Sequence, residues 1–257
     1  MKTKMWLLII LILLIADIFY EVNFPKVNKI EIKTDKVVAG EEIKIVQISD
    51  LHNKKFFNNN KFIYDKIREF NPDIIVLTGD IIDRRTTDYQ YAYSFIDDLM
   101  KINSNIYYIL GNHELSHRDV NDYKKELEKR GVLLMGDRAE TYKDISIYGA
   151  NYYEQKYPNP EGKYFSLLLT HDASLAISNY HNFDLVLSGH THGGQVRLPF
   201  IGAVYAPGQG FFPNHAKGLY KIENEKVYVD SGLGNTFLPI RFLNQSQISF
   251  IKIISSN

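Results

Sequence analysis

The sequence predicts an α/β fold that follows an N-terminal hydrophobic anchor helix. From residue 41 onward, short apolar runs typical of buried strands alternate with segments whose apolar residues recur at helical spacing. The N-terminus differs, because residues 5–16 form an unbroken apolar run. The remainder contains no internal repeat and no clear linker. We therefore expect an anchor segment over residues 1–22 and a single folded domain over residues 41–257.

The N-terminal apolar run has the flanks of a signal anchor. It is shorter than the ~20 residues that span a bilayer, but Trp6 and Tyr20 near its two ends are suited to the two membrane interfaces. A cleaved signal peptide is one alternative, and a buried core helix is another. No small-residue cleavage site follows the run. We therefore interpret the segment as an uncleaved, single-pass anchor in the cell membrane.

The charges around this run predict its orientation. Lys2 and Lys4 precede it, whereas Asp17 and Glu21 interrupt or follow it. Because cytoplasmic flanks are enriched in Lys and Arg, we expect a cytoplasmic N-terminus and an extracytoplasmic folded domain. Residues 22–40 would then form a tether that leads into a first edge strand.

The folded domain is predicted to contain alternating strands and helices. Residues 73–77 form a continuous apolar run between Pro72 and Gly79, which is typical of a buried strand. Residues 120–130 form a charged amphipathic segment, which predicts a helix that ends at Gly131. The same criteria predict two more helices at residues 62–70 and 91–100, and strands at residues 43–48, 106–110, 145–148, 165–169, 185–187, 220–222, 226–229 and 248–254.

Five of the predicted strands end in polar residues that can bind a metal ion. In open α/β sheets, ligands bind beyond the carboxyl ends of the strands, so these residues should converge on one rim. Several follow a glycine, where the backbone can turn tightly and approach an ion. Each motif alone is more often an ordinary turn, and only the whole series predicts a site. The motifs are Asp50-Leu51-His52, Gly79-Asp80 with Asp83, Gly111-Asn112-His113-Glu114, Thr170-His171-Asp172 and Gly189-His190-Thr191-His192.

The side chains in these motifs form a mixed set of nitrogen and oxygen ligands. Four imidazoles, two carboxylates and one amide suit Mn, Fe, Zn or Co. Seven ligands are too many for one tetrahedral ion and suit two divalent metal ions that share a bridge. We interpret the remaining histidines, His117, His181 and His215, as surface or core residues. The seven candidate ligands are Asp50, His52, Asp80, Asn112, His171, His190 and His192.

The composition excludes several other kinds of site. The sequence has no cysteine, which rules out disulfides, thiolate metal sites and cysteine nucleophiles. It has 30 Lys and Arg and 30 Asp and Glu, whereas proteins that bind nucleic acid through its phosphates are usually basic. We therefore expect no nucleic-acid partner. We expect a monomer that meets the membrane through its N-terminal segment.

The motif series resembles that of the calcineurin-like metallophosphoesterases. The pattern D-x-H, G-D-x-x-D, G-N-H-E, H and G-H-x-H covers about residues 43–235. The local sequences SDLH, GNHE and SGHTHGGQ, after a hydrophobic N-terminus, are similar to the bacterial membrane-associated branch that includes UDP-2,3-diacylglucosamine hydrolase-like phosphodiesterases. The resemblance implies two packed mixed β-sheets flanked by helices, and hydrolysis of a phosphoester by a metal-activated water.

The resemblance also implies a role for each candidate residue. Asp80 would bridge two metal ions through its carboxylate. His113 would act on the phosphoryl or leaving oxygen as a general acid or charge stabiliser, and Asp83 would orient it. Arg84 would contact phosphate or form an exposed salt bridge. The resemblance assigns the first metal to Asp50, His52 and His192, and the second to Asn112, His171 and His190.

Two segments depart from the family pattern. Asp172 and Ala173 follow His171, where relatives often have a proline two positions on. Residues 241–245 lack a Pro-Glu pair that is often found there. We expect neither segment to touch a metal ligand and both to influence the substrate rim.

The anchor favours a membrane or envelope substrate, such as a small-molecule or lipid-linked phosphoester. A phosphoprotein phosphatase, a nuclease on the same fold and a non-catalytic scaffold are the alternatives. Residues 195–218 directly follow the metal histidines and are rich in Phe, Tyr, Pro and Gly. Their apolar side chains either form a lip for an acyl chain or face the core, and we expect burial because it is the commoner arrangement. The side chains concerned are Phe200, Ile201, Phe211 and Phe212.

Overall fold

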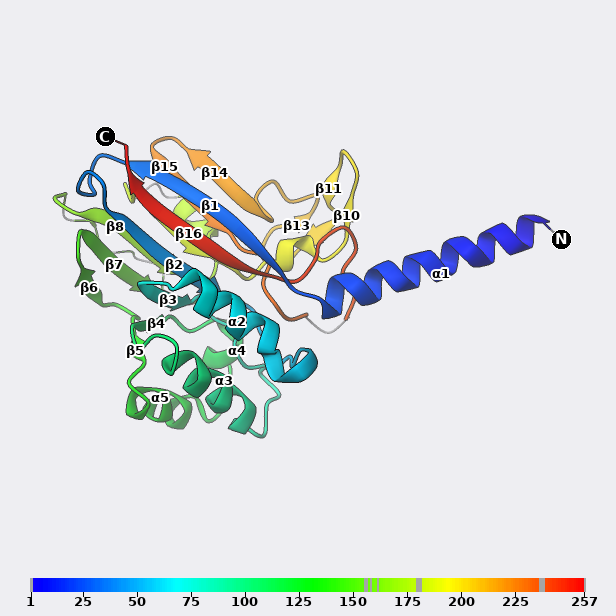
Figure 1. The fold of residues 1–257 in the computed structure, drawn as a ribbon, viewed down its shortest axis with the longest axis horizontal. Helices are drawn as coiled ribbons and strands as arrows, with labels where there is room; N and C mark the ends of the chain where they lie inside the picture. The colour runs from blue at the N-terminus through cyan, green and yellow to red at the C-terminus, as the bar shows by residue number, and fades with distance from the viewer. Residues whose placement is uncertain are drawn as a thin grey trace.

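Two six-stranded mixed sheets pack face to face between helices in the computed structural model (Figure 1). The structure describes residues 2–154, 157, 159–160, 162–178, 182–235 and 239–256. The facing sides of the sheets share one apolar cluster, in which Ile45 and Val76 of one sheet pack with Leu167 and Leu187 of the other. Other clusters join each outer face to its helices. The expected sandwich is confirmed.

The first sheet contains a parallel core and one strand that returns from much later in the chain. Its order is β1-β16-β2-β3-β4-β5. Strands β2 to β5 are parallel, whereas β16 lies between β1 and β2, antiparallel to β2 and parallel to β1. The strands are β1 (Lys26–Thr34), β2 (Glu42–Ile48), β3 (Ile74–Leu77), β4 (Ile106–Tyr108), β5 (Leu133–Leu134) and β16 (Gln247–Ser255).

The second sheet also has a parallel core, with an antiparallel strand at each edge. Its order is β14-β15-β9-β8-β7-β6. Two short hairpins, β10–β11 and β12–β13, lie between this sheet's strands in the sequence. The strands are β6 (Ala139–Tyr142), β7 (Ile145–Ala150), β8 (Phe165–Thr170), β9 (Leu185–Ser188), β14 (Gly218–Ile222) and β15 (Glu225–Val229), and those of the hairpins are β10 (Arg197–Leu198), β11 (Gly202–Ala203), β12 (Tyr205–Ala206) and β13 (Gly210–Phe211).

Amphipathic helices cover the outer faces of the sheets. In α2 (Lys61–Phe70), Ile63 and Ile67 are one turn apart and both face the core, as their spacing predicts. Helices α3 (Gln90–Met100) and α5 (Val120–Lys129) cover the same sheet, and α6 (Ser174–Ser178) lies on the other. Every strand and helix predicted from the sequence is present, with ends shifted by one or two residues. The expected tether over residues 22–40 is wrong, because residues 26–34 form the edge strand β1, which pairs along its length with β16. Strands β5 and β6 were not predicted either.

The N-terminal helix α1 (Lys2–Asn23) projects away from the folded domain (Figure 1). Its length and apolar composition fit a membrane anchor, and it is almost entirely exposed. The core-helix alternative is therefore wrong. Its last turn is held by the loop before β16: the Ser246 backbone N–H donates to the Glu21 carbonyl (2.9 Å), and the Gln245 side chain donates to the Phe24 carbonyl (2.6 Å).

Candidate metal centre

The loops that follow β2, β3, β4, β8 and β9 all lie at one end of the sandwich. Parallel strands bring their carboxyl ends to a common edge, so residues far apart in the sequence meet there. The structure brings together all seven residues that the sequence predicts as metal ligands. In strand order they are Asp50 and His52, Asp80, Asn112, His171, and His190 with His192.

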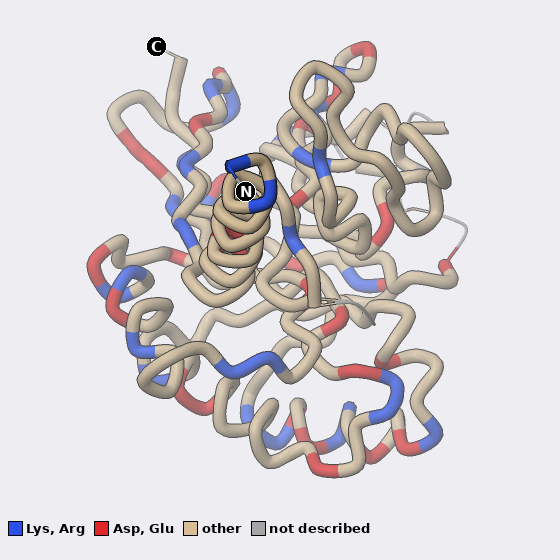
Figure 2. The backbone as a smooth tube through the Cα atoms, turned by 90° about the vertical axis from the view of Figure 1, so that its right-hand side faces the viewer, with Lys and Arg blue, Asp and Glu red and all other residues tan. Residues whose placement is uncertain are grey.

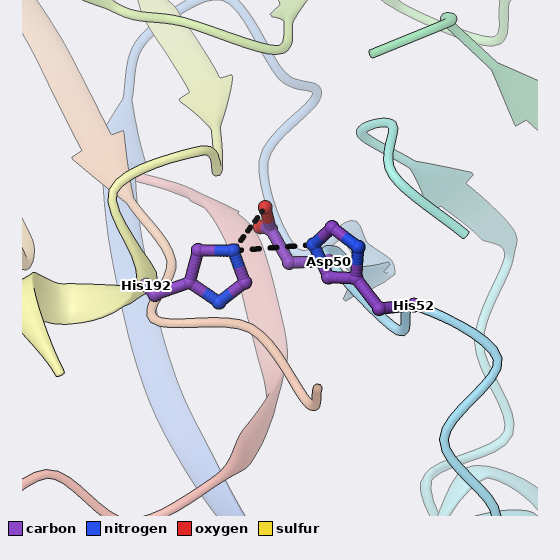
Figure 3. A group of neighbouring side chains, drawn as sticks. All are labelled: Asp50, His52 and His192. Atoms are coloured by element: carbon purple, nitrogen blue, oxygen red, sulfur yellow. Dashed lines mark hydrogen bonds and ion pairs between the residues drawn. The ribbon is translucent and has the colours of Figure 1, made fainter. Parts of the chain in front are cut away.

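One group of donors consists of Asp50, His52 and His192 (Figure 3). The Nε2 atom of His192 lies 3.2 Å from Nε2 of His52 and 3.4 Å from Oδ1 of Asp50. The backbone N–H of His190 donates to both carboxylate oxygens of Asp50, at 3.1 Å each. These contacts place two imidazole nitrogens and a fixed carboxylate around one point, which is the group that the resemblance assigns to the first metal.

The second group surrounds His171. Its Nε2 atom lies 3.1 Å from Oδ1 of Asn112, 3.2 Å from Oδ2 of Asp80 and 3.2 Å from Nδ1 of His190. Its other ring nitrogen, Nδ1, lies 2.7 Å from the Thr78 carbonyl, which fixes the ring. One N–H cannot satisfy three acceptors, whereas a cation can be shared by all of them. The donor set therefore fits a metal ion.

Asp80 lies between the two groups. Its Oδ2 atom is 3.2 Å from His171 Nε2 and 3.7 Å from His52 Nε2. Gly79 makes this approach possible: it has φ +88°, and a Cβ atom there would lie 2.6 Å from Nδ1 of His171. Only glycine fits this position without displacing the ring. Asp80 is thus within reach of both groups of donors.

Burial and neighbouring charges together control the charge of these donors: although burial opposes it, Asp80 raises the pKa of His171 to about 10. Burial lowers the pKa of His52 and of His190 to about 4 and that of His192 well below its usual value, so all three rings are neutral at pH 7 and can bind a cation. Burial raises the pKa of Asp50 to about 7. Although burial opposes ionisation of Asp80, His171 holds the pKa of that carboxyl below its usual value.

The backbone at this site is strained. A positive φ is uncommon outside glycine, because Cβ then crowds the peptide. Such strain is concentrated at functional sites, where the surrounding structure holds it in place. Five of the seven predicted ligands have a left-handed φ between 48° and 70°: Asp50, His52, Asp80, His190 and His192.

The three residues predicted to act on the substrate lie together beside the donors. Nδ1 of His113 is 3.2 Å from Oδ2 of Asp83, and its Nε2 is 3.2 Å from Nη2 of Arg84. The His113 ring also lies within ligand distance of His52 and Asp80. Burial lowers the pKa of His113. All three line a pocket of about 450 Å³ together with Asp80.

Sequence reasoning missed the part that Glu114 plays. This buried carboxylate accepts hydrogen bonds from the backbone N–H groups of Asp80, Ile81, Ile82 and Gly111, at 2.7–3.1 Å. The hydroxyl of buried Tyr108 donates a further bond of 2.8 Å. Glu114 therefore fixes two of the strand-end loops to each other. Its place in the GNHE motif was the available signal, since an acidic side chain one turn from Gly111 can reach free N–H groups.

Two sequence expectations are wrong. Residues 241–245 do contact a candidate ligand, because the side chain of Asn244 donates to the His192 carbonyl (2.7 Å). The apolar side chains of the hairpins do not face the core: Phe200 is fully exposed, and Phe211 is 74% exposed. Both errors have one cause, which is that neighbouring elements, and not local sequence, decide what these loops contact.

His117 and His215 lie outside the cluster, as expected. His117 is buried, with its ring nitrogens near the Tyr89 hydroxyl and the Thr86 carbonyl. His215 packs its ring against Tyr220. His181 lies outside the described residues.

Comparisons with known proteins agree with this geometry. The profile of the family described as calcineurin-like phosphoesterase matches residues 43–194. An uncharacterized metallophosphoesterase of Bacillus subtilis, YkuE, is 33% identical over 258 residues, covering 93% of this chain and 89% of that protein. A Danio rerio transmembrane protein with a metallophosphoesterase domain is 28% identical, covering 97% of this chain and 62% of its own length. A solved Staphylococcus aureus structure, named as a candidate 5'-nucleotidase, shares the fold with a TM-score of 0.50 at 10% identity, covering 84% of this chain and 55% of that one.

Proposed function

Because the chain belongs to the calcineurin-like phosphoesterase family, we propose that it is a membrane-anchored hydrolase of phosphoesters carried by lipids or other envelope molecules. Membership of the family shows the general reaction, which is metal-dependent hydrolysis of a phosphoester, but not the substrate. One observation supports hydrolysis at this site most strongly: seven donors from five strand ends converge beside the His113, Asp83 and Arg84 group. Four of the candidate ligands, Asp80, Asn112, His190 and His192, line the same pocket as these three residues.

The donors divide into two ligand sets in this proposal. Asp80 belongs to both, because its carboxylate lies between them. When bound, two divalent cations of the Mn, Fe, Zn or Co class would neutralise charge on the phosphate and lower the pKa of the attacking water. The first set is Asp50, His52 and His192, and the second is Asn112, His171 and His190.

His113 is the proposed general acid. His113 lines the pocket, with its Nε2 atom 3.2 Å from the Arg84 guanidinium, and its protonated ring would give a proton to the leaving oxygen. Asp83 lies at the other ring nitrogen and stabilises the protonated ring. Arg84 lies beside Nε2 of the same histidine, so its guanidinium can hold a phosphate oxygen next to the acid.

The test of the activity is hydrolysis of bis-p-nitrophenyl phosphate against p-nitrophenyl phosphate, metal by metal. A panel of lipid and nucleotide-lipid phosphoesters follows with the metal that works best. We expect turnover of at least one ester, and its loss in Asp80→Asn. A wild-type protein that binds metal yet hydrolyses neither ester would refute the proposal.

We also propose that α1 spans the cell membrane with the domain outside the cytoplasm. The two lysines before the apolar run support this orientation. Protease added to spheroplasts should then digest the domain without lysis. Protection until lysis would place the domain in the cytoplasm, and a soluble mature form starting near Glu21 would identify a cleaved signal.

A nuclease on the same fold is less well supported. Lys and Arg are interspersed with Asp and Glu over the side of the domain from which α1 projects (Figure 2). A nucleic-acid surface usually gathers basic residues into a stripe or patch. We therefore retain a lipid or envelope phosphoester as the proposed substrate.

A further inference from the structure

The two hairpins after the metal histidines expose an unusual apolar surface. Residues 198–213 contain no charged side chain. Four large apolar residues in this stretch are at least 60% exposed. Apolar residues are often exposed singly, but a cluster of them on short loops marks an interaction site. We call these four residues the hairpin tips: Phe200, Ile201, Phe211 and Phe212.

The hairpins that carry the tips lie on the side of the domain from which α1 projects (Figure 1). Short contacts join the two. The backbone N–H of Arg197 in β10 donates to the Phe242 carbonyl (3.0 Å), and two residues later the backbone N–H of Asn244 donates to the Glu21 side chain of α1. Leu243, between them, is also exposed. The domain therefore cannot tilt its hairpins away from α1 without breaking this connection.

The base of α1 shows the level at which the helix would leave a bilayer. Phe19, Tyr20 and Phe24 are exposed there, and Phe24 packs on Tyr20 and on Phe57, each with ring centroids 5.3 Å apart. Aromatic side chains of this kind concentrate at membrane interfaces. A bilayer around α1 would thus reach the side of the domain that carries the hairpin tips.

The second hairpin, β12–β13, forms a wall of the pocket that His113 lines. Tyr205 and Gly208 line it, and a Cβ atom at Gly208 would lie 3.5 Å from Nε2 of His190. The ring of Tyr205 packs edge-on against Phe211, with centroids 5.3 Å apart. One face of this hairpin therefore meets the metal donors, and the other is apolar and exposed.

We propose that the hairpin tips insert into the lipid bilayer in which α1 anchors the domain. The catalytic pocket then opens onto the membrane surface. This inference rests on the anchoring part of the proposed function. The occupant of the apolar surface is the acyl and headgroup boundary of a phospholipid bilayer, because the surface continues the aromatic base of the membrane helix. A substrate headgroup would then enter the pocket without leaving the bilayer.

Tryptophan quenching in the full chain tests the insertion. The only native tryptophan, Trp6, lies in α1, so it reports on anchoring. In a Trp6→Phe background, Phe200→Trp and Phe211→Trp report on the tips. Val38→Trp is the matched control, because Val38 is also apolar and exposed but lies in the loop beyond the far end of β1. The protein is reconstituted in vesicles of phosphatidylethanolamine and phosphatidylglycerol, with or without brominated acyl chains.

We expect the two tip tryptophans to be quenched at least about fivefold more strongly than Val38→Trp, and Trp6 to be quenched as well. Quenching of Trp6 without quenching at the tips would overturn the insertion and leave the anchor intact. An unquenched Trp6 would overturn the anchor together with the inference. Hydrolysis of bis-p-nitrophenyl phosphate by the protein in the same vesicles tests the catalytic proposal separately, since that soluble ester needs no contact with lipid.

Discussion

Asn244 connects Glu21, at the end of the N-terminal helix, to His192 in the metal centre. Its backbone N–H donates to the Glu21 carboxylate, and its side-chain amide donates to the His192 carbonyl at 2.7 Å. His192 has a left-handed backbone, which needs support from its neighbours. Asn244 thus ties the backbone of a candidate metal ligand to the helix that we propose spans the membrane.

Asn244→Ala should weaken metal binding while leaving every ligand in place. Removing a group that hydrogen-bonds to a metal ligand and orients it typically lowers metal affinity by about 10–100-fold. We expect a loss of about that size in a chelator-competition titration of the purified protein. Gln245→Ala is the control, because Gln245 contacts Phe24 and not the metal centre. Equal affinity in the two variants would contradict the role assigned to Asn244.

Asp80→Asn should lose at least one metal per chain and nearly all hydrolysis. The amide removes the negative charge that both ligand sets would share. Metal content is measured by plasma mass spectrometry, and turnover with bis-p-nitrophenyl phosphate. Asp172→Asn is the matched control: Asp172 lies near His190 but belongs to neither set, and this variant should keep its metal. Two metals per chain and normal turnover in Asp80→Asn would refute the bridging role.

His113→Asn should separate chemistry from metal binding. A general acid typically contributes about 10²–10⁴-fold to the rate, so kcat should fall by that factor with both metals retained. Asp83→Asn should give a smaller fall, since Asp83 acts through the histidine ring. A parallel loss of metal would show that His113 is a ligand, and a change confined to KM would indicate substrate binding.

Glu114→Gln should destabilise the fold by about 2–4 kcal/mol, because an amide cannot accept all of the hydrogen bonds that the buried carboxylate accepts. The free energy of unfolding is measured by urea titration in detergent. Glu128→Gln, on the exposed side of α5, is the matched control and should stay within about 0.5 kcal/mol of wild type. Similar unfolding midpoints for both variants would argue against the loop-fixing role of Glu114.

Lys217 should make stability depend on alkaline pH. Burial, reinforced by Lys26 and Arg241, lowers the pKa of Lys217 to about 7 in the folded chain, against about 10.4 when unfolded. Between these values the unfolded chain binds the extra proton, so stability rises with pH, by at most about 1.4 kcal/mol per unit. Below pH 7 the term is constant. Lys217→Met should flatten the rise between pH 7 and 10, and an unchanged slope would exclude Lys217 as its source.

Much of the centre could be predicted because its chemistry is local in the sequence. Each candidate ligand follows a recognisable strand, and parallel strands deliver their carboxyl ends to one edge. The Asn244 contact could not be predicted in this way. It depends on where the loop before β16 packs, and residues 192 and 244 have no pattern that links them.

The two hairpins show where prediction from the sequence fails. Periodicity and apolar composition indicate burial, but strands of two residues, as in β10 to β13, supply too little pattern to reveal which side faces the core. Phe211 is exposed because the β12–β13 hairpin turns its other face to the pocket wall. Strands β5 and β6 escaped prediction for a related reason, since Leu133–Leu134 is very short and Ala139–Tyr142 is largely exposed.

The position of β16 has a consequence for how the protein is made. Strand β16 lies between β1 and β2. The edges of β1 and β2 that pair with β16 therefore stay unpaired until residues 247–255 leave the ribosome. Pairings so distant in sequence form late, and exposed strand edges invite aggregation in the interval. A chain that crosses the membrane as proposed would therefore be translocated before its first sheet can close. Nascent chains stalled before residue 247 should remain protease-sensitive, and release of the last strand should be the step that confers resistance.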